Sequence, residues 1–186
     1  MPRISAATNA AQRENTKRAI LESFGKLLYS RGLPGLTMTD VAKNAGIGRT
    51  AVYNYFADMG ELLVAYALDE TERFIKELDE GLEGVDNPID QLAVYIRLQI
   101  EDLARRHLPP GPAMRSMLSP ESYAKLGKHV RELQIVLANI LSAAIAEHYI
   151  PENDIRELAM LVHGSLSSSA GRTEDAPDED TRERQI

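Results

Sequence analysis

The sequence predicts an all-α protein. Apolar residues recur at intervals of three and four along most of the 186 residues, the period of a helix that buries one face. No run of alternating apolar and polar residues is long enough for a convincing strand, and no Asn-Gly hairpin turn occurs. Glycine, proline and capping residues punctuate the periodic segments. We expect a three-helix head over residues 1–57 and a helical bundle over residues 58–186.

The first helix of the head is expected over about residues 11–31. Its apolar residues fall on one stripe, which predicts a buried face, and Gly32 follows as a stop signal. The stripe consists of Ile20, Phe24, Leu27 and Leu28.

Two short helices are expected next, at about 38–45 and 49–55. Thr37 and Asp40 have the spacing of a capping box at the start of the first. Ala42 permits a close crossing, and Gly46 supplies a residue that tolerates positive φ in the turn. The apolar residues that fit the inner faces are Val41, Ala45, Ile47 and Val52. This is the spacing of a helix-turn-helix, whose second helix is placed to enter the DNA major groove.

The rest of the chain predicts a bundle of longer helices. We expect one from residue 58 or 60 to 81, one from Pro88 to about 106, and one from Pro120 to 149 in which Gly127 marks a candidate break. A short helix or turn precedes Pro120, and a last helix follows Pro151 to about residue 170. The polar, acidic end is expected to be a loose tail or a short surface helix.

Charge is divided unevenly along the chain. Residues 1–60 hold eight Lys or Arg against four Asp or Glu, a net charge of +4 within a chain of net charge −7. The remaining residues hold 13 against 24, a net charge of −11. A basic head on an acidic body indicates that only the head meets a polyanion.

Several functional classes find no support. The sequence has no cysteine, so it has no disulfide, thiolate metal site or cysteine nucleophile. The four histidines show no i, i+4 pairing, and we expect no metal and no cofactor. The N-terminus lacks the apolar core of a signal peptide, and the longest apolar run, residues 62–68, is far too short to span a membrane. We expect a cytoplasmic protein without a membrane partner.

Residues 36–63, LTMTDVAKNAGIGRTAVYNYFADMGELL, resemble the DNA-binding region of the tetracycline-repressor (TetR) family. The Ala-Gly turn, the VYNYF segment and the following ELL stand where that family has them, and the resemblance extends over about residues 12–68. It implies an N-terminal helix-turn-helix domain and a C-terminal domain for ligand binding and dimerisation. The expected partners are a double-stranded DNA operator, a second copy of the chain and a small-molecule effector of unknown identity.

The resemblance implies roles for several residues of the head. Arg49 and Thr50 would face base edges, where an arginine can donate two hydrogen bonds to guanine. Tyr53, Asn54 and Tyr55 would contact phosphates and sugars, although Tyr53 could be a half-buried packing residue and Tyr55 could equally belong to the core. Phe56 is expected in the core. The full set of expected DNA contacts is Thr37, Thr39, Lys43, Gly48, Arg49, Thr50, Tyr53, Asn54 and Tyr55.

Two positions depart from the family pattern. Gly48 stands where the family usually has serine or threonine, so the N-cap of the recognition helix has no hydroxyl. Met59 stands where the family usually has a lysine that contacts phosphate. The loss of one cation puts affinity in doubt more than mechanism.

The dimer interface is expected on two stripes near the C-terminus. Small residues among them permit close approach of helices, and the resemblance implies a four-helix interface. The alternative is that both stripes belong to the core of one chain. The expected interface residues are Leu133, Leu137, Ile140, Leu141, Ala144, Leu158, Val162, Ser165, Leu166 and Ser169.

The helix from Pro88 to about 106 suggests a ligand site. We expect its buried face to carry Ile89, Leu92, Ile96, Ile100 and Leu103, with the polar Gln99 among them. A buried amide needs a partner, which is either the backbone or a ligand. The candidate ligand-binding residues are Tyr95, Gln99, Met114, Met117 and Tyr123. The acidic body favours a cationic or neutral ligand.

The expected function is that of a sequence-specific DNA-binding transcriptional regulator, a repressor that binds a palindromic operator as a dimer and is released by its ligand. Two alternatives remain open at this point. One is a helical protein-interaction module without DNA binding, and the other is an uncharacterised helical enzyme. No nucleophile–base pair, phosphate-binding loop or metal set supports the enzyme.

Overall fold

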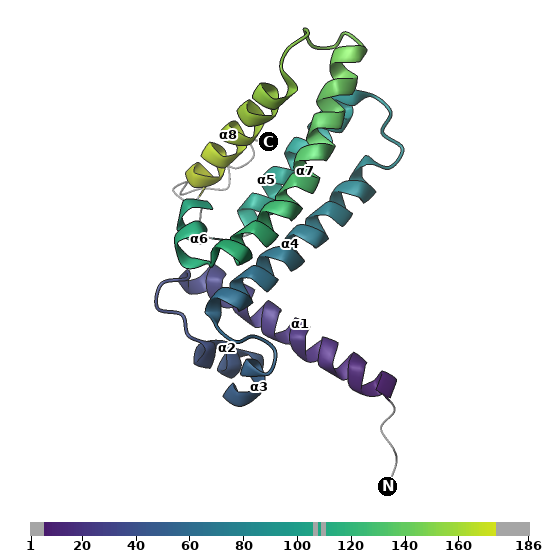
Figure 1. Cartoon of the computed structure of the whole chain (residues 1–186). Helices are drawn as coiled ribbons and strands as arrows, with labels where there is room; N and C mark the ends of the chain where they lie inside the picture. The colour runs from purple at the N-terminus through teal and green to yellow at the C-terminus, as the bar shows by residue number, and fades with distance from the viewer. Residues whose placement is uncertain (1–5, 106–107, 109–110, 174–186) are drawn as a thin grey trace. The chain divides into compact units, whose positions relative to one another are not determined.

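The computed structural model describes residues 6–105, 108 and 111–173, with the side chains of 6–8, 111–113, 128–130 and 167–173 outside that description. Within these residues every regular element is an α-helix (Figure 1). The helices are α1 (Ala6–Arg31), α2 (Met38–Ala45), α3 (Arg49–Tyr53), α4 (Met59–Leu82), α5 (Pro88–Arg105), α6 (Gly111–Met117), α7 (Pro120–Ala146) and α8 (Ile155–Thr173). The all-α prediction is confirmed.

The helix boundaries agree best where capping signals are strong. Helix α2 has the predicted bounds, whereas α1 starts five residues earlier than expected, at Ala6. Helix α3 ends at Tyr53 instead of residue 55. Helix α7 continues through Gly127 without a break, because a single glycine costs a helix only about 1 kcal/mol.

The chain folds into two compact units, which do not follow the expected division at residue 57. The first unit comprises residues 1–69 and 107–126, and the second comprises residues 70–106 and 127–186. Leu62 and Leu63 of α4 explain the shift, because they are buried in the same apolar cluster as Phe24 and Val41 of the head. The first part of α4 therefore belongs to the first unit.

The core of the first unit joins α1, α2, α3 and the start of α4. Phe24 is fully buried and packs edge-on against Tyr66, with ring centroids 5.4 Å apart. Gly25 makes this approach possible, since a Cβ there would lie 2.9 Å from the Tyr66 ring. Val52 and Phe56 close the core, as predicted for Phe56.

The second unit is a helical bundle whose core comes from α4, α5 and α7, with α8 packed against it (Figure 1). Its buried residues are Phe74, Leu78, Tyr95, Leu98, Leu133, Leu137, Ile140 and Leu141. Gly81 allows α4 and α5 to approach closely, because a Cβ there would lie 2.9 Å from Leu98 Cδ1.

The prediction of which residues of α5 are buried is wrong. Ile89 is exposed, and the buried residues of the helix are Pro88, Tyr95, Leu98 and Asp102. The expected residues Leu92, Ile96, Ile100 and Leu103 are only half-buried, as is Gln99. Apolar residues occur all around α5, so its sequence does not define a single stripe.

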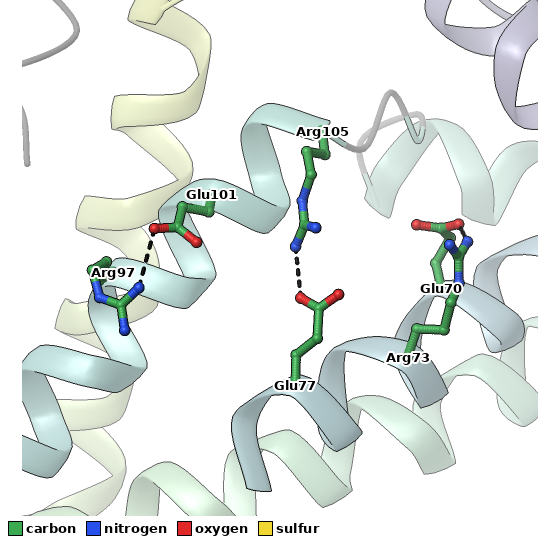
Figure 2. A network of polar contacts seen from close by, with 6 residues as sticks. All are labelled: Glu70, Arg73, Glu77, Arg97, Glu101 and Arg105. Atoms are coloured by element: carbon green, nitrogen blue, oxygen red, sulfur yellow. Dashed lines mark hydrogen bonds and ion pairs between the residues drawn. The ribbon is translucent and has the colours of Figure 1, made fainter. Parts of the chain in front are cut away.

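Charged side chains pair along the helices of the second unit (Figure 2). Arg105 of α5 donates a 2.7 Å hydrogen bond to Glu77 of α4, which joins these helices. Arg97 pairs with Glu101 at 3.3 Å along α5, and Arg73 pairs with Glu70 along α4. None of the helices in the described part of the chain is long and apolar enough to cross a membrane.

Candidate nucleic-acid interface

Helix α2 is fixed at its start by the predicted capping box. The backbone N–H of Asp40 donates to Thr37 Oγ1 at 3.2 Å, and the backbone N–H of Thr37 donates to Asp40 Oδ2 at 3.0 Å. The hydrogen bond from the Thr37 hydroxyl also lowers the pKa of the Asp40 carboxyl. Thr37, an expected DNA contact, thus has a demonstrated role as the N-cap.

The turn between α2 and α3 has the predicted geometry. Gly46 has φ 69°, the left-handed conformation that favours glycine, and its N–H bonds to carbonyls in the last turn of α2. The N–H of Ile47 donates to the Ala42 carbonyl at 3.0 Å. These bonds end α2 and set the direction in which α3 leaves.

Ser23 of α1 holds α2 in place, a role that the sequence analysis missed. Its hydroxyl is buried and lies 3.1 Å from the Val41 carbonyl oxygen and 2.9 Å from Asn44 Oδ1. The signal was present, because Ser23 adjoins Phe24 on an apolar stripe, and a buried hydroxyl needs a partner.

Helix α3 turns its apolar residue inward and its polar residues outward. Val52 is fully buried, whereas Arg49, Thr50, Tyr53 and Asn54 are exposed. Gly48 is the N-cap and makes no side-chain cap bond, as expected from its lack of a hydroxyl. The chain therefore presents the start of α3, which carries Arg49 and Thr50, to solvent.

Two arginines stack on the aromatic residues at the end of this region. Arg49 Cζ lies 5.6 Å from the ring centroid of Tyr53, one turn along α3. Arg13 of α1 lies 5.3 Å from the ring of Tyr55, which is half-buried against the core. Both distances are those of cation–π contacts. Tyr55 thus packs as well as stacks, and Arg13 joins this surface although no local sequence signal links residues so far apart.

The other expected contacts also lie on the surface of the first unit. Thr39 and Lys43 are exposed on α2. Met59 is half-buried and packs against the core, so the position that usually carries a lysine in the family serves packing here. Asp58 and Glu61 form hydrogen bonds at the start of α4: Glu61 N–H donates to Asp58 Oδ1 at 2.8 Å.

The expected dimer interface needs correction. Leu133, Leu137, Ile140, Leu141 and Ala144 of α7 and Leu166 of α8 are buried within the chain itself, so they offer no surface to a partner. Leu158 and Val162 are half-buried and pack against the same core. Ser165 is exposed, and the side chain of Ser169 lies outside the described residues. The helical period identified buried faces correctly but could not tell which partner buries them.

The expected ligand residues are divided between the two units. Tyr95 and Gln99 stand one turn apart on α5 in the second unit. Met114 is buried and Tyr123 half-buried against the core of the first unit, and Met117 is 50 % exposed. His163 of α8, which the sequence analysis did not select, packs edge-on against Tyr95 with ring centroids 6.3 Å apart.

The site chemistry is that of a binding surface. No group of three or more His, Cys, Asp or Glu side chains in the described ranges is arranged to hold a metal ion. The exposed groups of α2 and α3 are hydroxyl, amide, phenol and cationic side chains, which can donate hydrogen bonds to phosphates and base edges.

The sequence of this region is similar to that of known bacterial regulators. Residues 20–66 match the model of the family described as bacterial regulatory proteins, tetR family. An uncharacterised HTH-type transcriptional regulator of Haemophilus influenzae is 34 % identical over 74 residues, which cover 39 % of this chain and 36 % of that protein. The HTH-type transcriptional regulator TtgR of Pseudomonas putida is 32 % identical over 75 residues, 39 % of this chain and 36 % of the relative. The matching segment thus spans about a third of these curated relatives.

The fold match extends over most of the chain. A TetR-family transcriptional regulator from Rhodococcus, described as putative, superposes with a TM-score of 0.75 at 22 % identity, over 91 % of this chain and 94 % of that one. The capped α2, the left-handed Gly46 and the outward-facing α3 lie within the segment that the family model matches. Over residues 20–66 this chain is similar to the tetR family of bacterial regulatory proteins.

Proposed function

We propose that the protein is a sequence-specific DNA-binding regulator, a repressor that binds a palindromic operator as a dimer and leaves it when an effector binds. The observation that carries the proposal is the outward presentation of Arg49 and Thr50 on a helix whose opposite face, at Val52, is fully buried. A buried anchor and exposed polar groups at the helix start suit insertion into the major groove. Such a protein acts in the cytoplasm, where the operator is.

Base reading falls to Arg49 and Thr50 in this proposal. The Arg49 guanidinium can donate two hydrogen bonds to O6 and N7 of a guanine. Its contact with the Tyr53 ring limits the conformations that it samples before binding, which lowers the entropy lost on binding DNA. Thr37, Thr39, Lys43, Gly48, Tyr53, Asn54 and Tyr55 are proposed to border the groove and to contact the backbone.

The dimer interface is proposed on the exposed faces of α7 and α8. Ile135 of α7 and Met160 and Leu161 of α8 are large apolar side chains that are 58 %, 65 % and 67 % exposed. Ser165 lies one turn beyond Leu161 and keeps that face shallow enough for a second helix to approach. A second copy of the chain would cover these residues and supply the second head that a palindrome requires.

Release by an effector would act through the second unit. FadR from Bacillus subtilis, a transcriptional regulator whose structure was solved in complex with stearoyl-CoA, superposes on this chain with a TM-score of 0.69 at 20 % identity, over 82 % of this chain and 84 % of that one. This likeness supports a small-molecule effector for the present fold. A coupling of about 1–3 kcal/mol between effector and DNA is typical of such regulators.

Selection of bound duplexes from a random pool tests the DNA-binding proposal. The wild-type chain should enrich a palindromic sequence, and Arg49→Ala should lose that preference because it removes the donors to guanine. Lys76→Ala, which removes an exposed cation from α4 in the second unit, is the matched control and should enrich the same sequence. A pool without enrichment by the wild type would instead favour the protein-interaction module.

Sedimentation analysis tests the dimer. Leu161→Arg places a charge on the proposed interface and should convert a dimer into monomers. Ile89→Arg, on an exposed apolar residue of α5, is the control that should remain dimeric. A wild-type chain that sediments as a monomer at the concentrations used for DNA binding would contradict the proposed dimer.

A further inference from the structure

Three polar side-chain atoms of the second unit are buried without a hydrogen-bond partner: the Tyr95 hydroxyl, Gln99 Oε1 and His163 Nε2. Among the described residues, no other buried side-chain nitrogen or oxygen atom lacks a hydrogen-bond partner. Tyr95 and Gln99 are one turn apart on α5, and their Cβ atoms are therefore neighbours on one side of the helix. His163 comes from α8, and its ring packs edge-on against that of Tyr95.

The surroundings of these atoms are apolar. Tyr95 is fully buried, and it belongs to the apolar cluster of the second unit that also contains Leu98 and Leu137. Val162, next to His163 in the sequence, packs against that cluster. A buried polar group without a partner destabilises a fold, so retention of three such groups between two packed helices indicates that something completes their hydrogen bonds.

The three atoms define what a partner must offer. Gln99 Oε1 only accepts hydrogen bonds, whereas the Tyr95 hydroxyl can donate one. Neutral His163 donates from Nε2 in one of its tautomers. One hydroxyl group satisfies all three, because it donates a single hydrogen bond and accepts two. A carboxylate has no proton to donate to Gln99.

We propose that Tyr95, Gln99 and His163 form the recognition point for the hydroxyl group of an uncharged, otherwise apolar effector, an alcohol or a phenol. The inference rests on the proposed effector response and names the chemical class of the ligand. The apolar cluster around Tyr95 receives the hydrocarbon part of the effector, and the three polar atoms select its hydroxyl.

The charge state of the site agrees with a neutral ligand. Burial raises the pKa of Tyr95 to about 12 and lowers the pKa of His163, so both side chains are uncharged at pH 7. The acidic Asp102 is buried one turn beyond Gln99 on α5.

Three probes with one ring system separate the head-group chemistry from apolar attraction. 1-Naphthol carries the hydroxyl, naphthalene lacks it, and 1-naphthoate carries an anion instead. Titration calorimetry on the full chain without DNA should show 1-naphthol bound at least about tenfold more tightly than either relative, the factor expected for one or two buried hydrogen bonds. Phenol serves as the smaller probe of the same chemistry.

Tyr95→Phe tests the site itself, because it removes only the unpartnered oxygen. It should weaken 1-naphthol about tenfold, leave naphthalene unchanged and leave the melting temperature equal or higher. Tyr149→Phe is the matched control: this hydroxyl is exposed and accepts a 2.8 Å hydrogen bond from Asn87, and its loss should not change 1-naphthol binding.

Several results would overturn the proposal. Equal affinity for the three naphthalene probes would show apolar attraction alone, and tighter binding of 1-naphthoate would show an anion site. A lower melting temperature for Tyr95→Phe would show that its hydroxyl is already bonded within the free protein. Failure of both 1-naphthol and phenol to bind would exclude the class. Since DNA is absent from these measurements, their failure is distinct from a failure to enrich an operator.

Discussion

Each unit buries a hydroxyl group, Ser23 in the first and Tyr95 in the second, and these two hydroxyls differ in their partners. In the first unit, the buried Ser23 hydroxyl has oxygen partners on Val41 and Asn44. In the second unit, the hydroxyl of the fully buried Tyr95 and the Oε1 atom of Gln99 have no partner. The first arrangement fixes helices relative to one another, whereas the second leaves hydrogen-bonding capacity unused in an apolar setting.

This difference suits the two proposed roles, DNA binding by the first unit and effector binding by the second. A surface that reads DNA needs helices held in one geometry, and satisfied hydrogen bonds provide that rigidity. A unit that responds to an effector needs groups whose bonding changes when the effector arrives, because a ligand shifts an equilibrium only through differential interactions. Substitutions that remove one polar atom from each unit should therefore have opposite effects on stability.

The largest expected difference is between Ser23→Ala and Gln99→Met. Ser23→Ala should lower the free energy of unfolding by about 1–2 kcal/mol, because it removes a buried hydrogen bond between α1 and α2. Gln99→Met replaces an unpartnered oxygen by an apolar group of similar shape and should be neutral or stabilising. Urea denaturation measures both, and a destabilised Gln99→Met would show that the oxygen is satisfied in the folded chain.

A smaller effect concerns the two short helices of the first unit, which differ in their caps. Gly46→Ala should cost about 1 kcal/mol through backbone strain alone, because φ is 69° and no atom lies within 4 Å of the added Cβ. Gly48→Ser should instead add about 0.2–0.4 kcal/mol by giving α3 the side-chain cap that it lacks, because glycine is itself an adequate N-cap. Thermal unfolding of the two variants should move in opposite directions, and equal shifts would contradict this account of the turn.

The helix-turn-helix was predictable because its determinants are local. Thr37 and Asp40 are three residues apart and make the expected box, and Gly46 has the positive φ that its place in the turn demands. Val52 and Phe56 are buried as the inner face requires. Each of these features depends on residues within a few positions of one another, so a local sequence pattern is enough to predict it.

The candidate effector site was only half predictable because its determinants are distant in the sequence. Tyr95 and Gln99 could be selected as polar groups within an apolar helix, but α5 has apolar residues on all sides and its buried face was misjudged at Ile89. His163 meets Tyr95 from another helix, and no local pattern reports that contact. The stripes of α7 and α8 likewise predicted burial without revealing that the covering residues belong to the same chain.

The smallest expected effect concerns the paired charges of the second unit, which lie on its surface. The Glu77 and Arg105 side chains are 40 % and 56 % exposed and join α4 to α5 at 2.7 Å (Figure 2). The hydrogen bond from Arg105 to Glu77 raises the pKa of the guanidinium, but solvent screens most of the attraction.

A double-mutant cycle with Glu77→Gln and Arg105→Gln should give a coupling of about 0.2–1 kcal/mol that shrinks as salt is raised. The Lys76–Glu80 pair, 3.7 Å apart and more exposed, is the internal reference and should couple less. A coupling energy for Glu77 and Arg105 well above this range would show that this ion pair stabilises the packing of α4 against α5. The contrast would then be limited to the buried groups compared above, Ser23 against Tyr95 and Gln99.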